Sequence, residues 1–266
     1  MKLRTTIFCC AVLSMILTKA MSQSGNHWIN PDYKLIAHRG GVVDSTSAEN
    51  SLPALREAVK RGYYMAEIDL RLTRDSVLIT HHDRNFLRDF GVDAQVTSMT
   101  WKDIEKLRGK RGNKILKLED VLKYSRGKIQ IMLDNKISGN DTVLFTRVID
   151  MLKKYDLYEN ALMIGTDEST EFFTGKIKLS CTRKQLEENM LKPGFKAENY
   201  YLFSNNIPKQ DAEWARQKKI LTIGVINAWD LKSADPQKVA AERADQIKSA
   251  GIHYIQIDSD FEKYFR

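Results

Sequence analysis

Cysteine is scarce in this chain of 266 residues, which contains only three. Cys9 and Cys10 lie in a short apolar stretch near the N-terminus, and only Cys181 lies beyond it. A single cysteine cannot form an internal disulfide, so the rest of the chain must be stabilised by its packed core. A chain of this length can bury a large one.

The sequence also lacks an apolar run long enough to cross a bilayer. Its most apolar stretch, residues 7–17, follows the basic segment 1–4 and precedes several small residues. This order is typical of a secretory signal peptide that is cleaved before Gln23. We therefore expect residues 1–22 to be removed and residues 23–266 to be exported, to the periplasm or outside the cell. An uncleaved anchor is the alternative.

The chain has no arginine-rich run and no stripe of interleaved aromatic and basic residues, which argues against a nucleic-acid partner. Removal of residues 1–22 takes away three basic residues and no acid, which lowers the formal net charge from +8 to +5. Ordinary solubilising charge explains this mild excess, and assistance to an anionic substrate is the alternative. The sequence has no linker or low-complexity segment after the N-terminal stretch, so residues 23–266 are predicted to form one domain. The oligomeric state is left open.

Short apolar segments alternate with helical patterns along most of the chain, which is typical of βαβ units around a parallel sheet. Strands are predicted at residues 34–38, 64–72, 77–80, 129–133, 161–165, 177–181, 200–203, 220–226 and 253–257. Helices are predicted at residues 51–62, 100–107, 118–122, 142–154, 168–174, 183–191, 208–218 and 236–250.

The spacing of the second and third predicted strands decides the fold. Only residues 73–76 separate them, whereas a parallel crossover needs about a dozen residues or more, so the third strand must run antiparallel to the second. The eight other strands are the number that closes a barrel. We therefore predict an α/β fold, a (β/α)8 TIM barrel with an extra antiparallel hairpin strand after the second strand. A doubly wound open sheet is the alternative, but the glycine-rich dinucleotide fingerprint is missing.

Three carboxylates are predicted to face the interior of the barrel near its rim. Side chains alternate along a strand, which places Glu67 and Asp69 on one face of the second strand and turns Asp134 and Lys136 inward on the next parallel strand. Buried carboxylates repel one another unless a cation lies between them. Oxygen ligands suit one hard divalent cation, Ca²⁺ or Mg²⁺. The alternative is an ion-pair network with the neighbouring cations Arg39, Arg71 and Lys136.

The hairpin is predicted to bring a histidine to these acids. If its turn is centred between Asp75 and Ser76, Asp69 lies opposite His82, and facing residues project to the same side of a sheet. His82, rather than His81, is therefore expected to join the carboxylates.

A second histidine, His38, ends the first predicted strand. Two histidines that converge on an acidic cluster from different strands suit general acid and base roles near neutral pH. His27 and His253 have no such company and are predicted to be structural or on the surface.

Six short motifs follow one another along the chain. They are His38-Arg39-Gly40, Glu49-Asn50-Ser51, Glu67-Ile68-Asp69, Thr73-Arg74-Asp75, His82-Asp83 and Asp134-Asn135-Lys136. This ordered set resembles the signature of the glycerophosphodiester phosphodiesterase family, from about residue 35 to residue 258. The resemblance implies a TIM barrel, a divalent metal and hydrolysis of a glycerophosphodiester substrate to glycerol 3-phosphate and an alcohol.

The resemblance also implies roles for individual residues. His38 and His82 match the catalytic histidines, while Arg39 and Lys136 match cations that contact the substrate phosphate. Glu67 and Asp69 match metal ligands, with Asp134 as the third. Asp134 stands where the family usually has glutamate, one methylene longer, so its contact with the metal is direct or mediated by water.

Supporting roles are expected for three further residues. Asp83 is expected to orient His82 or the backbone at the rim. Glu49 and Asn50 either contact the metal or the substrate, or else order the loop beneath His38 and help to cap the next helix. Gly224 stands where the family often has tryptophan, which predicts a wider pocket for the alcohol.

Two other functions stay open. A related phospholipase D or lyase type would leave a cyclic phosphate product, and a binding protein would retain the barrel without turnover. The lyase would need an apolar entrance at the rim, and the sequence has no long apolar loop to form one. The presence of both histidines and both principal carboxylates argues against the binding protein.

Overall fold

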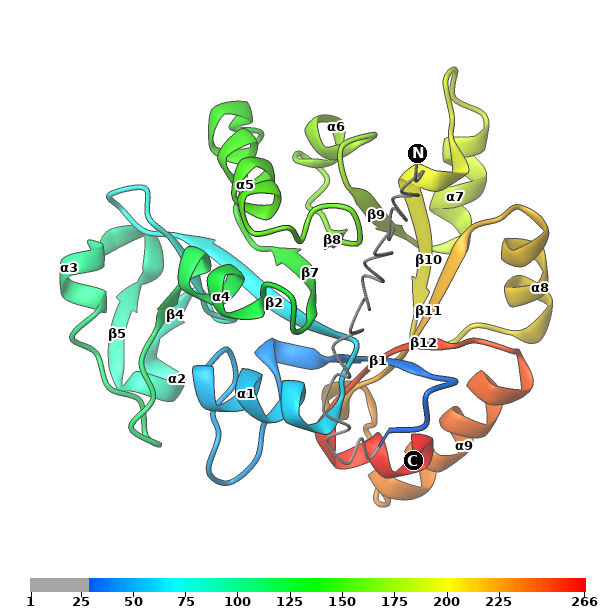
Figure 1. The fold of residues 1–266 in the computed structure, drawn as a ribbon, viewed down its shortest axis with the longest axis horizontal. Helices are drawn as coiled ribbons and strands as arrows, with labels where there is room; N and C mark the ends of the chain where they lie inside the picture. The colour runs from blue at the N-terminus through cyan, green and yellow to red at the C-terminus, as the bar shows by residue number, and fades with distance from the viewer. Residues whose placement is uncertain (1–28) are drawn as a thin grey trace, which may run out of the picture.

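The computed structural model describes residues 29–266, and the predicted signal peptide lies outside the described residues. Parallel strands form a closed barrel (Figure 1). In order around it they are β1 (Lys34–Ala37), β2 (Met65–Leu72), β7 (Gln130–Asn135), β8 (Leu162–Ile164), β9 (Lys178–Cys181), β10 (Tyr200–Ser204), β11 (Leu221–Ile226) and β12 (Tyr254–Ile257). Because β1 pairs in parallel with both β2 and β12, the barrel closes. The predicted eight-stranded TIM barrel is confirmed.

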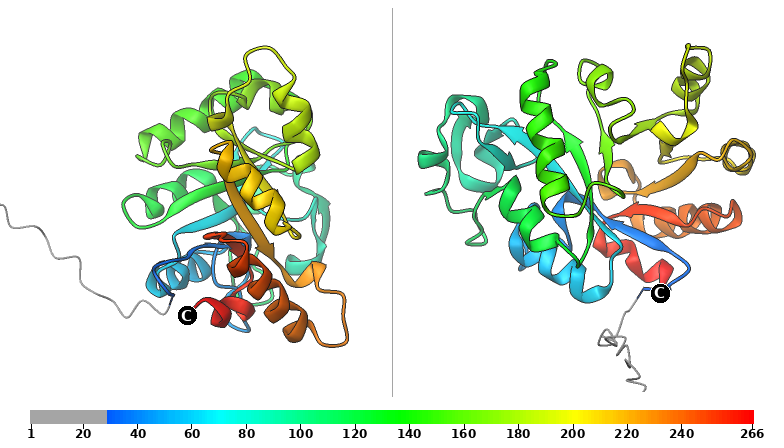
Figure 2. Two further views of the ribbon diagram at one scale, coloured as in Figure 1. Left: turned by 90° about the vertical axis from the view of Figure 1, so that its right-hand side faces the viewer. Right: turned by 45° about the horizontal axis from the view of Figure 1, so that its top comes forward.

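Helices lie outside the barrel, between successive strands (Figures 1 and 2). They are α1 (Leu52–Arg61), α4 (Leu118–Ser125), α5 (Thr142–Lys154), α6 (Thr170–Phe173), α7 (Arg183–Met190), α8 (Lys209–Gln217) and α9 (Pro236–Ser249). Their ends follow the sequence: the Ser51 side chain accepts a hydrogen bond from the Ala54 amide, and Gly62 ends α1 with a left-handed φ of 84°. Short 3-10 turns are η1 (His38–Gly40), η2 (Val96–Ser98), η3 (Ala197–Asn199), η4 (Ala228–Asp230) and η5 (Ser259–Phe265).

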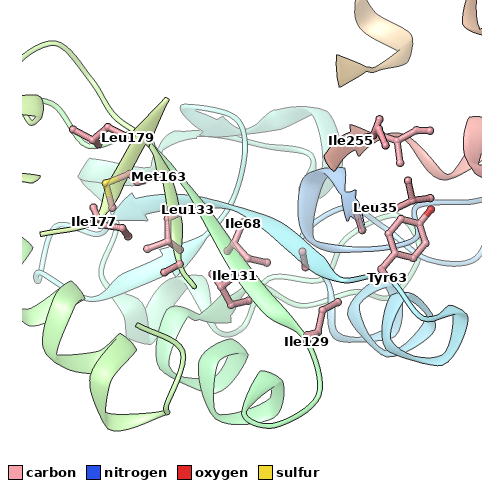
Figure 3. Packing of buried hydrophobic residues seen from close by; sticks show 14 of the residues in the cluster. Leu35, Tyr63, Ile68, Ile129, Ile131, Leu133, Met163, Ile177, Leu179 and Ile255 are labelled. Carbon is pink, nitrogen blue, oxygen red and sulfur yellow. The ribbon is translucent and has the colours of Figure 1, made fainter. Parts of the chain in front are cut away.

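The core has two layers because side chains alternate along the strands. One layer lies between barrel and helices and includes Ile68 from β2 with Ile131 and Leu133 from β7 (Figure 3). The other fills the barrel and includes Met65 and Met132, which lie below the acidic residues on the same inward faces. The apolar filling therefore stops where the carboxylates begin, at the carboxyl-terminal rim.

Residues 73–117 form an excursion beside the barrel, at the left of Figure 1. It contains β3 (Leu78–Thr80), β4 (Asn85–Phe86), β5 (Val92–Gln95), β6 (Leu116–Lys117), α2 (Leu87–Phe90) and α3 (Trp101–Ile104). Strand β3 runs antiparallel to β2, as predicted, and β6 extends the sheet beyond it. A small core that includes Phe86 and Ile104 stabilises this part. Strands β4 and β6 were not predicted, because a two-residue strand has no alternation to detect.

The predicted register of the hairpin is wrong by one residue. Leu70 pairs with Thr80, and the His81 amide donates to the Asp69 carbonyl at 3.0 Å, so His81 lies opposite Asp69. The physical reason is the loop, which has three residues centred on Asp75 rather than two, with Ser76 in the left-handed region at φ 59°. Strand β3 ends at Thr80, so alternation does not govern the histidines that follow.

No helix within residues 29–266 has the length and apolar character needed to cross a membrane. Cys181 is buried and unpaired, and burial raises the pKa of its thiol to about 11. The described part of the chain therefore holds no disulfide, in agreement with the sequence analysis.

Candidate active site

Glu67, Asp69 and Asp134 meet at the carboxyl ends of β2 and β7. The parallel register places Asp69 beside Asp134, and both carboxylates of β2 are only 1% exposed. One oxygen from each of the three side chains lies within 4.8 Å of the others. The structure thus brings together the three acids that strand alternation predicts.

The charge of this cluster is only partly compensated, because Lys136 contacts Asp69 and Asp134 but no ion pair within residues 29–266 involves Glu67. Burial raises the pKa of Glu67 well above its ordinary value, and the charges of Asp69 and Asp134 raise it further. Burial likewise raises the pKa of Asp134. Glu67 Oε2 accepts a hydrogen bond from the Arg39 amide at 2.8 Å, but the buried Oε1 has no partner. An orphaned oxygen among three carboxylates fits a hard cation such as Ca²⁺ or Mg²⁺, which binds oxygen ligands.

Asn50 and Lys136 hold the acids in place. Asn50 Nδ2 donates to Asp69 Oδ2 at 2.8 Å, while Lys136 Nζ lies 2.5 Å from Asp134 Oδ2 and 3.4 Å from Asp69 Oδ1. Asn50 adopts a left-handed φ of 51°, and its amide donates to the Arg39 carbonyl. It therefore joins the loop after β1 to the acidic cluster, and Ser51 rather than Asn50 caps α1.

His38 is paired with Asp258, which sequence reasoning missed. Its Nδ1 lies 2.6 Å from Asp258 Oδ1, and the other oxygen of Asp258 accepts the Ala228 amide at 2.6 Å. Burial would raise the pKa of Asp258, but the hydrogen bond and charge of His38 bring it below its ordinary value. An ionised Asp258 keeps the His38 proton on Nδ1 and leaves Nε2 able to accept. The only signal was that Asp258 directly follows the last predicted strand.

His82 has a similar arrangement with its neighbour. Its Nδ1 lies 2.8 Å from Asp83 Oδ1, and Arg88 Nε donates to Asp83 Oδ2 at 2.6 Å. Burial opposes ionisation of Asp83, yet hydrogen bonds from Arg88 and His82 hold its pKa far below the ordinary value. Asp83 is thus placed to orient His82, as expected, whereas the role of Arg88 was not anticipated from the sequence.

Arg39 links the two histidines to the acids. It has a left-handed φ of 52°, and its guanidinium donates to Glu49 Oε2 at 2.9 Å and lies 3.3 Å from His82 Nε2. Glu49 also contacts Arg88. Burial would raise the pKa of Glu49, but the two arginines lower it overall. Glu49 therefore orders the two arginines and is not among the three acids that could hold a metal ion.

Other histidines lie apart from this site. His81 is buried, bonds through Nε2 to the Asn85 carbonyl at 2.9 Å and stacks on Phe86 at 4.9 Å between ring centroids. Burial lowers the pKa of His81, which fits a structural role. His253 Nδ1 contacts the Asp32 carbonyl, and His27 lies outside the described residues.

The expectation about Gly224 is wrong. A Cβ at this position would lie 2.8 Å from Ile247 Cδ1 on α9, so residue 224 faces the helix layer and not the barrel mouth. The alternation of β11 explains this, because Ile223 on the neighbouring position fills the barrel. Gly224 allows close approach of α9 and does not widen a substrate pocket.

A family model covers most of the described chain. The model of the glycerophosphoryl diester phosphodiesterase family matches residues 38–250. The chain belongs to this family. The matched residues include both histidines of the site and all three carboxylates, whereas Asp258 lies beyond them.

Curated relatives match over part of their length. A human lysophospholipase D is 29% identical over 136 residues, which cover 46% of this chain and 42% of that protein. A probable glycerophosphodiester phosphodiesterase of Mycobacterium tuberculosis is 37% identical over 87 residues, or 33% of each chain. The chain thus spans less than half the length of these relatives.

Solved structures of family members share the fold. A glycerophosphoryl diester phosphodiesterase from Parabacteroides distasonis has a TM-score of 0.70 at 21% identity, with 89% of this chain and 87% of that chain covered. An Oleispira antarctica phosphodiesterase in complex with sn-glycerol-3-phosphate has a TM-score of 0.66 at 14% identity, with 86% and 94% covered. At these identities the likeness concerns the barrel itself.

Proposed function

We propose that this chain is a metal-dependent phosphodiesterase that hydrolyses glycerophosphodiesters to glycerol 3-phosphate and an alcohol. The observation that carries the proposal is the pairing of two histidines, each with its own carboxylate, beside a cluster of three acids with an orphaned oxygen. Membership of the glycerophosphoryl diester phosphodiesterase family supports the substrate class.

Glu67, Asp69 and Asp134 would hold one divalent cation, Ca²⁺ or Mg²⁺. When bound, the cation supplies positive charge to the non-bridging oxygens of the phosphodiester. Lys136 lies against two of these acids and would add charge on the same phosphate. Arg39, which lies beside His82, would add positive charge to the same phosphate from that side.

His38 is the proposed base. Because Asp258 holds its Nδ1 proton, Nε2 can take a proton from the nucleophile, which is water or a neighbouring hydroxyl of the substrate. His82 is the proposed acid and gives its proton to the departing alkoxide, while Asp83 stabilises the protonated ring. A bound phosphate would draw Arg39 away from His82 Nε2 and leave that nitrogen free to carry the proton.

The test is an assay of residues 23–266 on a panel of glycerophosphodiesters, with ³¹P NMR of the products. We expect glycerol 3-phosphate from the wild type with added Ca²⁺ or Mg²⁺, and none after chelation. His38→Ala and His82→Ala should abolish release, whereas the control His253→Ala, which changes a histidine remote from the rim, should not.

The assay separates the alternatives. A cyclic phosphate that accumulates would identify the lyase type. Substrate binding without any product would identify a binding barrel, and turnover unaffected by chelation would contradict the metal site.

We further propose that the protein is exported after cleavage before Gln23, on the basis of the N-terminal sequence pattern. N-terminal sequencing of the protein recovered from the expressing cell should begin at Gln23. Recovery of the intact chain in the cytosol would contradict this proposal.

A further inference from the structure

Two clefts lie at the rim near the three acids. The larger one lies on the side of β2, β7 and the excursion. It has a volume of about 610 Å³, and its lining includes Arg71, Arg84 and Lys136. The cleft beside His38 is smaller, about 200 Å³, and lies at the ends of β1, β11 and β12. Because β2 and β7 carry the acids, the two clefts extend from the cluster in different directions around the rim.

The charges of the two clefts differ. The larger one has three cations and no carboxylate in its lining, and its other polar residues include Gln95 and Thr97. The smaller one is lined by three carboxylates, Glu49, Asp258 and Asp260, together with His38 and Arg39. An anionic group would therefore be attracted to the first cleft and repelled from the second.

Arg71 and Arg84 have no ion-pair partner in the described part of the chain, unlike Arg39, Arg88 and Arg243. Arg71 is fixed by backbone carbonyls: its Nε and one terminal nitrogen donate to the His82 carbonyl at 3.1 and 2.6 Å. Carbonyls orient the guanidinium without neutralising it.

Lys136 joins the cleft to the reaction site, because it lines the cleft and contacts Asp134 and Asp69. A substrate whose scissile phosphate lies at Lys136 could place one arm against Arg71 and Arg84. The smaller cleft beside His38 has room for the uncharged glycerol arm.

We propose that the cleft of Arg71 and Arg84 binds a second anionic group on the alcohol arm of the substrate. The protein then prefers glycerophosphodiesters whose alcohol carries a phosphate over those with an uncharged alcohol. This inference rests on the proposed phosphodiesterase function and assigns the substrate class within it.

The test compares bis(glycerophosphoryl)glycerol, whose alcohol arm carries a second phosphodiester, with glycerophosphoglycerol, whose arm is uncharged. We expect kcat/KM to be about tenfold higher for the first, which exceeds the twofold factor from its two scissile groups. Arg84→Ala should bring the ratio close to two, because it removes an exposed guanidinium of the cleft. The matched control, Arg74→Ala on the exposed hairpin loop, should leave the ratio unchanged. Raising the salt concentration should reduce the wild-type ratio.

A wild-type ratio of two or less, or an unchanged ratio in Arg84→Ala, would overturn the inference while leaving the proposed function intact. If neither diester is hydrolysed, the proposed function fails and the cleft is tested by binding alone. Calorimetric titration of bis(glycerophosphoryl)glycerol into the His38→Ala protein should then show binding that Arg84→Ala weakens about tenfold. Equal binding by both proteins would contradict the cleft as well.

Discussion

The two histidines of the site are held in similar ways by different parts of the molecule. His38 stands at the end of β1, and its partner Asp258 follows β12, so the pair closes the seam between the first and last strands of the barrel. His82 stands on the excursion, and its partner is the next residue, anchored by Arg88. The first pair depends on barrel closure, and the second depends on local chain geometry. The exposure also differs, because 10% of the His38 side chain is exposed and 30% of His82.

The sharpest test of this comparison separates the two proton transfers. His82→Ala should lose about a thousandfold in kcat on glycerophosphocholine but little on the 4-nitrophenyl diester of glycerol 3-phosphate, whose leaving group needs no proton. His38→Ala should lose about a thousandfold on both substrates. Steady-state kinetics on the two substrates check this. If the 4-nitrophenyl diester restored the activity of His38→Ala and not that of His82→Ala, the two roles would be reversed.

The pair with the less exposed histidine, His38 with Asp258, should be the more sensitive to loss of its carboxylate. Asp258→Asn no longer holds the His38 proton on Nδ1 by charge, so kcat should fall about a hundredfold with KM little changed. Asp260→Asn, which alters a neighbouring carboxylate of the same cleft, serves as the control. A fall confined to KM would mean that Asp258 acts on binding and not on His38.

Asp83→Asn should cost less, about tenfold in kcat, because His82 is more exposed and water can replace part of the lost interaction. Steady-state kinetics on glycerophosphocholine measure kcat for Asp83→Asn and Asp258→Asn under the same conditions. A larger loss than that of Asp258→Asn would break the comparison, because it would tie the loss to the more exposed histidine.

The smallest expected effect concerns stability without metal. The folded-state pKa of Glu67 is raised, chiefly by burial, well above the ordinary glutamate value of about 4.5. The stability contributed by its protonated form is therefore complete below about pH 4.5 and is lost as pH rises through the folded pKa. Glu67→Gln should stabilise the metal-free protein at neutral pH by about 1 kcal/mol.

Urea denaturation in the presence of a chelator measures this change. Glu242→Gln, on the exposed face of α9, is the matched control and should change nothing. Added Ca²⁺ or Mg²⁺ should stabilise the wild type but not Glu67→Gln. Destabilisation of the metal-free protein by Glu67→Gln would contradict the uncompensated charge at this position.

The fold was accessible from the sequence because alternation and capping are local signals. Helix α5 begins at Thr142 and ends at Lys154, where the pattern predicted it, and the inward face of β7 follows parity. The same parity brings Glu67, Asp69 and Asp134 together. The hairpin register could not be predicted because the residues between the two strands are compatible with either a two-residue or a three-residue loop. A serine gives no sign in the sequence of the left-handed conformation that Ser76 adopts.

The missing parts of the site are long-range contacts. Asp258 and His38 are 220 residues apart, and no pattern in the sequence connects them. The contact of Asn50 with Asp69 depends on the path of the loop after β1, which a left-handed backbone sets. The prediction for Gly224 was wrong because a sequence resemblance aligns residue positions but does not say which side of a strand each residue faces. The pleat of β11 turns residue 224 toward the helix layer.

The central claim is that the ends of β2 and β7 form a cation site between two histidine–carboxylate pairs. Calorimetric titration of Ca²⁺ and Mg²⁺ into the metal-free protein tests it most directly. We predict one ion per chain in the wild type and none in Glu67→Gln, with activity that rises in step with occupancy. No binding of either ion by the wild type, or full activity without binding, would contradict the account.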